Sequence, residues 1–235
     1  MANGCSIIVW NLWGETMTDG TRATRGYLPI QFADTVLIED PAEQERLNAI
    51  LLRPHERNPR VLIRHYKATK RQKLKEELEW FAQHTTLESA ISDAAMSIDQ
   101  KGKRFRHQHR IKKKVLVSAR ETLLGIAPKL AGCRSFEELY MAIESALQSV
   151  DGVGKLYVYD VALRIGAKIG DKAGLLPRKV FLHAGTRRVA KALGLNGQLS
   201  WLEMDSLPEW LRELQPYEVE DFLCIYKDRL AARES

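Results

Sequence analysis

Cysteine is scarce in this chain of 235 residues, occurring at Cys5, Cys133 and Cys224. Three widely separated cysteines without a Cys-x-x-Cys pair exclude a disulfide framework and a cysteine-rich metal site. Long apolar runs are missing too, and no charged segment followed by an apolar stretch of signal-peptide length opens the sequence. We therefore expect a cytoplasmic protein with no membrane partner, no bound metal and no cofactor.

Acidic residues are outnumbered by basic ones. The 30 Asp and Glu stand against 36 Lys and Arg, which gives a formal charge of +6 and a pI near 9.2. This excess favours a polyanionic partner without identifying it. With 45% hydrophobic residues, the chain is long enough for one sizeable core or for two small helical lobes that share a cleft.

Helical periodicity is weak in the first 40 residues. An apolar stretch, SIIVWNLW at residues 6–13, precedes a segment rich in Gly, Thr and Arg. We expect residues 1–40 to form an irregular arm that packs on the core. This arm could supply one wall of a pocket for an extruded base, or its tryptophans could simply pack in a core. The candidate pocket residues of the arm are Trp10, Trp13, Glu15 and Tyr27.

Helical patterns begin near Pro41. Residues 61–84 have the apolar spacing of an amphipathic helix, and residues 86–98 form another such pattern, opened by Thr86 and Ser89 as a cap. We expect a mainly α protein in which residues 41–130 form one helical lobe and residues 131–235 a second.

The strongest charge feature is the basic segment of residues 101–114, KGKRFRHQHRIKKK, in which eight of fourteen residues are Lys or Arg. Such a run can neutralise DNA phosphates, and the alternative is a solvated start of a helix. The candidate phosphate contacts are Arg104, Arg106, Arg110, Lys112, Lys113 and Lys114.

A glycine-rich turn separates two helical patterns in the second lobe. The first helix starts after Ser135 and ends near residue 150, and the second covers residues 156–170. Gly152 and Gly154 permit a tight hairpin, and the valine between them can anchor it in the core. Backbone amides at the start of the second helix could bind a phosphate together with Lys155. The expected DNA contacts of the hairpin are Gly152, Val153, Gly154 and Lys155.

Residues 150–166, VDGVGKLYVYDVALRIG, resemble the hairpin of helix-hairpin-helix DNA glycosylases. Residues 177–195, PRKVFLHAGTRRVAKALGL, resemble the next piece of that family, a strand-like approach followed by a VDTHV-type motif that opens a helix. The resemblance implies two helical lobes around a DNA-binding cleft, and an enzyme that flips a base out of double-stranded DNA. It adds Arg187 and Arg188 to the expected DNA contacts and Tyr157 to the base pocket.

The sequence departs from this family at its catalytic positions. The family's Asp in the VDTHV motif aligns with His183, and the Lys of the lyase branch aligns with Leu156. A glycosylase therefore needs another anion, and Asp160 lies one turn after Leu156 on the same helix face. We expect Asp160 to be the catalytic carboxylate and His183 to donate to the leaving base or to polarise water.

Structural roles are the alternative for these residues. Asp160 could pair with Arg164 four positions later, and His183 could cap a helix. The pattern of residues 217–230 contains Glu220 and Asp221, which could supply a carboxylate to the cleft or belong to a helix that merely covers the core.

We thus expect a monomeric, monofunctional DNA glycosylase that leaves an abasic site. Its substrate could be glucosylated hydroxymethylcytosine in phage DNA, as in bacterial antiviral glycosylases that this chain resembles. A repair glycosylase for alkylated or oxidised bases and a non-catalytic helix-hairpin-helix DNA-binding protein are the alternatives.

Overall fold

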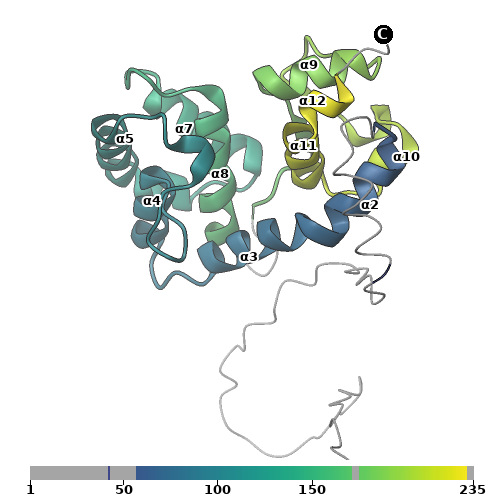
Figure 1. Cartoon of the computed structure of the whole chain (residues 1–235). Coiled ribbons are helices and arrows are strands. Elements are labelled where there is room, and N and C mark those ends of the chain that lie inside the picture. The colour runs from purple at the N-terminus through teal and green to yellow at the C-terminus, as the bar shows by residue number, and fades with distance from the viewer. Residues whose placement is uncertain (1–41, 43–56, 171–174, 232–235) are drawn as a thin grey trace, which may run out of the picture.

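The computed structural model describes residue 42, residues 57–170 and residues 175–231, and it is mainly helical, as expected (Figure 1). Helices α2 (Pro59–Thr69) and α3 (Arg71–Ala82) run along one side of the molecule and connect its two lobes. The single helix expected over residues 61–84 is interrupted at Lys70. Just before this break, the Thr69 hydroxyl donates to the carbonyl oxygen of His65 at 2.8 Å, a bond that bends helices.

The first lobe is built around α8 (Lys155–Ile169), of whose 15 residues ten are buried. A helix buried on most of its circumference needs neighbours on several sides. Helices α3, α4 (Leu87–Met96) and α7 (Phe136–Leu147) supply them, and α5 (Lys113–Gly125) packs on α4 and α7. The short helices η1 (Arg106–Gln108) and α6 (Ala127–Ala131) complete this lobe.

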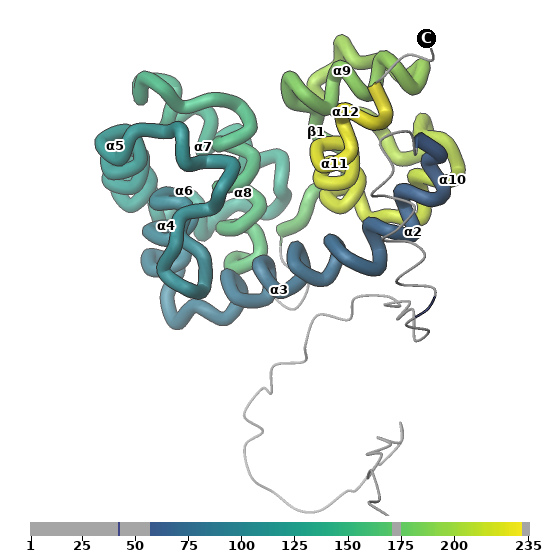
Figure 2. The backbone as a smooth tube through the Cα atoms, in the orientation of Figure 1, coloured from purple at the N-terminus to yellow at the C-terminus, as the bar shows by residue number. Residues whose placement is uncertain are grey.

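The second lobe combines α2 with the C-terminal part of the chain (Figure 2). Tyr66 of α2 packs edge-on against Phe222 with ring centroids 5.8 Å apart, which joins segments far apart in sequence. The other elements of this lobe are β1 (Val180–Phe181), α9 (Ala184–Ala192), β2 (Trp201–Leu202), η2 (Met204–Ser206), α10 (Glu209–Arg212), α11 (Pro216–Ile225) and α12 (Lys227–Leu230). Strands β1 and β2 pair antiparallel.

The division between the lobes differs from the expected boundary at residues 130 and 131. Leu123 before that boundary and Phe136 after it belong to the same hydrophobic core. The local patterns identified amphipathic helices, but they did not show that α8 needs partners from both sides of residue 130. Likewise, nothing local in α2 indicated that it packs with residues 180–230.

Strand β1 and helix α11 contribute to both cores. Phe181 lies in the first core, whereas its neighbours Val180 and Leu182 lie in the second, as the alternation of side chains along a strand requires. On α11, Tyr217 joins the first core and Val219 the second. The polar residues of α11 and α8 are therefore held at the junction of the lobes.

Two helix starts expected from the sequence are confirmed. The Ser89 amide donates to the Thr86 hydroxyl at 3.1 Å at the start of α4. The Glu138 amide donates to the Ser135 hydroxyl at 3.1 Å at the start of α7. In the described parts of the chain, every helix is too short or too polar to cross a membrane.

Candidate functional site

A short turn joins α7 to α8 where the sequence predicts the hairpin. The Val153 amide donates to the Val150 carbonyl at 3.3 Å, and Val153 packs against the first core as expected. Gly152 has a φ of +91°, a conformation that other residues rarely adopt. Gly154 precedes α8 with a φ of −103°, and a Cβ there would meet no atom within 4 Å. The backbone at the start of α8 is thus open to an approaching molecule.

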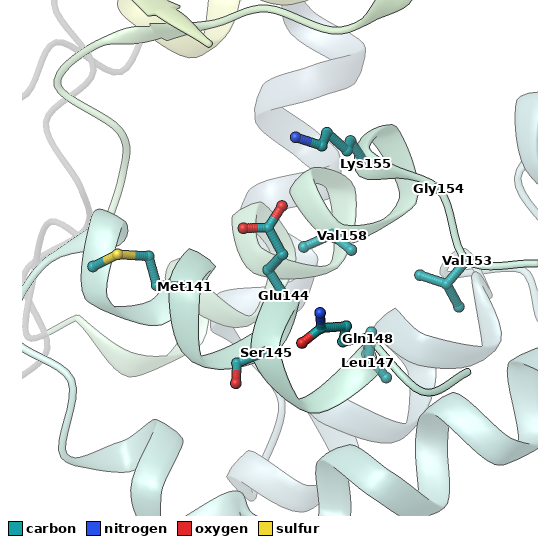
Figure 3. Close-up of a pocket in the computed structure, with 9 residues that line it drawn as sticks. All are labelled: Met141, Glu144, Ser145, Leu147, Gln148, Val153, Gly154, Lys155 and Val158. Carbon is teal, nitrogen blue, oxygen red and sulfur yellow. The ribbon is translucent and has the colours of Figure 1, made fainter. Parts of the chain in front are cut away.

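A hollow of about 470 Å³ lies beside this hairpin, between α7 and the start of α8 (Figure 3). Lys155 and Glu144 both reach toward it, so its lining carries charges of both signs. The Glu144 carboxylate accepts a hydrogen bond from the Tyr140 hydroxyl at 3.3 Å. The remaining lining residues are Met141, Ser145, Leu147, Gln148, Val153, Gly154 and Val158.

The basic segment and the hairpin lie side by side. A Cβ on Gly152 would lie 3.4 Å from Cγ2 of Val115, which directly follows Lys114 in α5. The start of α5 therefore adjoins the hairpin that precedes α8. Several basic side chains of the segment are exposed, among them Arg106, Arg110, Lys112, Lys113 and Lys114.

Three of the arginines expected to contact DNA also have protein partners. The guanidinium of Arg104 donates to the carbonyl oxygens of Gln108 and Ile111 at 2.6 and 2.8 Å, so Arg104 holds the loop of the basic segment together. Arg187 donates to the Leu182 carbonyl at 3.2 Å. Arg188 is exposed and pairs with Asp228 at 2.9 Å.

The placement of Tyr157 in a base pocket is wrong. Its ring is buried in the first core, and its hydroxyl donates to the Ala95 carbonyl at 2.6 Å. Helical spacing predicted the face of α8, but not that α4 covers it. The other expected pocket residues, Trp10, Trp13, Glu15 and Tyr27, lie outside the described residues.

The carboxylate of Asp160 is hydrogen-bonded through one of its two oxygens. Its Oδ2 accepts hydrogen bonds from Nε2 of Gln108 at 2.6 Å and from Nε2 of His107 at 3.0 Å. Both of its hydrogen bonds from the residues that the structure describes go to Oδ2 and none to Oδ1, and 14% of the side chain remains exposed. One oxygen is thereby fixed, and the other is available to a ligand.

A chain of polar contacts anchors the donors of Asp160. The Oε1 of Gln108 accepts from Nη1 of Arg164 at 3.2 Å, and Nε of Arg164 pairs with Glu77 at 2.7 Å. The Arg164 guanidinium also lies over the Phe105 ring, 3.8 Å from its centroid, in a cation-π contact. The alternative expectation of a pair between Asp160 and Arg164 is thus replaced by a relay through Gln108.

His183 stands immediately before α9, at the position where the family resemblance places an Asp. Its backbone amide donates to the Thr186 hydroxyl at 2.7 Å, but neither ring nitrogen has a hydrogen-bond partner among the described residues. Burial lowers the pKa of His183 from 6.5 to about 4, although the Asp160 charge acts in the opposite direction. His183 is therefore neutral at pH 7.

Helix α11 adds two carboxyl groups to the junction. The pKa of Asp221 is raised from 3.8 to about 6, mainly by burial; a 3.0 Å hydrogen bond from the Tyr66 hydroxyl opposes the rise, and the charges of Glu77 and Asp160 contribute to it. Burial also raises the pKa of Glu220 well above its ordinary value, and its Oε1 lacks a hydrogen-bond partner within the described parts of the chain.

The junction thus brings together both expected catalytic residues, Asp160 and His183, and the two carboxyl groups of α11. Sequence reasoning missed His107 and Gln108 because both lie inside the basic segment, which was interpreted through its phosphate-binding charge. Among the described residues, no three His, Cys, Asp or Glu side chains are arranged to hold a metal ion.

Comparisons with protein-family models, with curated proteins and with solved structures found no match to this chain.

Proposed function

We propose that this protein is a monofunctional DNA glycosylase, which removes a modified or damaged base from double-stranded DNA and leaves an abasic site. The observation that supports this most is the state of Asp160. One of its oxygens is fixed by His107 and Gln108, and the other accepts no hydrogen bond from the described residues. A fixed carboxylate of this kind can stabilise a positive charge that develops nearby.

The surroundings of Asp160 suit a DNA substrate. The basic segment ends next to the hairpin, where Val115 adjoins Gly152, and its middle lies at Asp160, where His107 and Gln108 donate to the carboxylate. Asp160 lies six residues after Gly154 in α8, or about 9 Å along the helix axis. A phosphate bound at the start of α8 would therefore lie about 9 Å from Asp160, measured along this helix axis.

The chemistry follows from charge. Breaking the bond between a base and its sugar leaves positive charge on the sugar, and Oδ1 of Asp160, which takes no part in the bonds to His107 and Gln108, is the group that would face it. The neutral ring of His183 cannot be this anion, and it would donate a hydrogen bond to the leaving base only if DNA binding exposes its buried nitrogens. Leu156 stands where the lyase branch has its Lys, so strand cleavage would require alkali after base release.

The substrate we favour is glucosylated hydroxymethylcytosine in phage DNA, which makes the protein a cytoplasmic antiviral enzyme that acts as a monomer. Alkylated or oxidised bases are the alternative. The test is incubation of the full chain with duplexes that carry normal, alkylated, oxidised, hydroxymethylated or glucosylated bases, followed by heating in alkali. Strand breaks confined to one modified duplex support the proposal. Intact strands in every duplex contradict it.

The burial of both His183 ring nitrogens favours a second candidate, a DNA-binding protein without catalysis. In that case, the protein would bind all these duplexes with similar affinity and break none after alkali.

DNA binding by the basic segment can be tested separately. Changing Lys112, Lys113 and Lys114 to Ala should weaken binding to every duplex and should reduce the salt slope by about 0.9 for each lost phosphate contact. Lys129→Ala, on the exposed side of α6, is the control and should leave the slope unchanged. Fluorescence anisotropy at several salt concentrations measures both. An unchanged slope in the triple variant would remove the segment from the DNA interface.

A further inference from the structure

The basic segment contains a histidine whose geometry differs from that of its neighbours. His107 belongs to η1, and its Nε2 lies 3.0 Å from Oδ2 of Asp160. Half of its side chain is exposed, against 14% for Asp160. The pair therefore has an inner carboxylate and an outer imidazole.

The hydrogen bond defines which ring nitrogen can react. A carboxylate only accepts, so Nε2 of His107 carries the proton in this bond, and Nδ1 keeps a free lone pair. Nδ1 has no hydrogen-bond partner in the part of the chain that the structure describes. The carboxylate thereby orients the ring and stabilises the cation that forms when Nδ1 takes a proton.

The loop that carries His107 is firmly attached. Gln108 is buried and hydrogen-bonds to both Asp160 and Arg164. The Arg104 guanidinium donates hydrogen bonds to two carbonyl oxygens of the same loop. Side chains held in this way keep the narrow geometry that proton transfer requires. His109, two residues later, is by contrast exposed and bonded through Nε2 to the Arg104 carbonyl.

We propose that His107 is a catalytic general base, which activates the water that attacks the sugar, and that Asp160 orients it. This inference rests on the proposed glycosylase function. The water oxygen forms a bond to the anomeric carbon, and its proton passes to Nδ1 of His107. The bond from this carbon to the base nitrogen breaks, and its electron pair leaves with the base. The proton on His107 then returns to the solvent or to the departed base.

The experiment compares His107→Gln, His107→Ala and the control Asp205→Asn, an exposed residue of η2, in single-turnover base release from the duplex that the wild type attacks. The Gln amide can still donate to Asp160, but it cannot take a proton. We expect both His107 variants to slow release by about 100-fold or more, with DNA affinity unchanged, and the control to keep the wild-type rate. Added imidazole should partly restore His107→Ala.

The outcomes separate the two proposals. If His107→Gln keeps the wild-type rate, the ring only orients Asp160, and the general-base role is wrong while the glycosylase stands. If the wild type releases no base from any duplex, the glycosylase proposal fails, and the base role fails with it. Nitrogen NMR of the free protein gives a further check, because a proton on Nδ1 instead of Nε2 of His107 at pH 7 contradicts the base role.

Discussion

Tyr159 and Asp160 are neighbours on α8, yet they lie in opposite kinds of polar surroundings. Asp160 has two donors, a third residue anchoring one of them, and partial exposure. The Tyr159 hydroxyl is buried beside Glu220 and His183, and all three side chains have buried polar atoms without partners among the described residues. Asp160 is thus a carboxylate held by hydrogen-bond donors, whereas Tyr159, Glu220 and His183 have buried polar atoms that no described residue binds.

The physical reason is desolvation. A buried polar atom without a partner costs about 1–3 kcal/mol, and a buried charge costs more, so groups without partners lose their charge. Burial accordingly raises the pKa of Tyr159 and Glu220 and lowers that of His183, so for each of the three it favours the neutral form. Asp160, whose carboxylate is held by His107 and Gln108, is therefore the group suited to stabilise a cation.

The largest expected effect comes from breaking the support of Asp160. Arg164→Met removes a buried guanidinium from Glu77 and Gln108, which should lower the free energy of unfolding by about 3 kcal/mol in urea titrations. The matched control is Arg188→Met, whose ion pair with Asp228 is exposed and should cost less than about 1 kcal/mol. Equal losses in both variants would mean that the relay does not support Asp160.

A smaller effect is expected at Asp221, a buried carboxyl group that accepts one hydrogen bond, from the Tyr66 hydroxyl. Its pKa of about 6 exceeds the ordinary value of 3.8, so the folded state binds this proton more tightly than the unfolded state. Stability should therefore fall as the pH rises from about 4 through about 6. Asp221→Asn removes this penalty and can still accept from the Tyr66 hydroxyl, so it should be about 2 kcal/mol more stable than the wild type at pH 8.

The same variant should match the wild type near pH 4, where both side chains are neutral. Urea titrations at pH 4 and pH 8 measure the difference, with the exposed Asp205→Asn as control. If Asp221→Asn is less stable than the wild type at pH 8, the surroundings of Asp221 stabilise its charged form, as hydrogen-bond donors do for Asp160.

The smallest effect is expected at Tyr159, whose buried hydroxyl has no partner among the described residues. Tyr159→Phe removes a hydroxyl without a partner, so stability should stay unchanged or rise by about 1 kcal/mol. Tyr157→Phe is the control, because it loses the hydrogen bond to the Ala95 carbonyl and should be destabilised by about 1 kcal/mol. Thermal denaturation compares the two. A similar loss in both would indicate a partner for the Tyr159 hydroxyl, such as a bound water.

Local patterns predicted the local structure of this chain well. The caps at Thr86 and Ser135 are visible in sequence because a cap and its helix are adjacent in the chain. The contact of Val153 with the core, in the turn between α7 and α8, was predicted for the same reason. The open glycine is Gly154, whereas the one with positive φ is Gly152, and the pattern Gly-x-Gly alone does not distinguish them.

The surroundings of the candidate site could not be predicted in the same way. Asp160 was identified from its face on α8, but its donors come from η1, more than fifty positions earlier. Tyr66 reaches Asp221 from α2, at a separation of 155 positions. Such contacts depend on how whole helices pack, and apolar periodicity shows that a face is buried without showing what covers it.

The most direct test of the account is Asp160→Asn. In single-turnover reactions with the duplex that the wild type attacks, this variant should release no measurable base, while its DNA affinity stays within about twofold of the wild type. Asp205→Asn, an exposed carboxylate on η2, should release base at the wild-type rate. Base release by Asp160→Asn at the rate of this control would contradict the assignment of Asp160 as the catalytic anion.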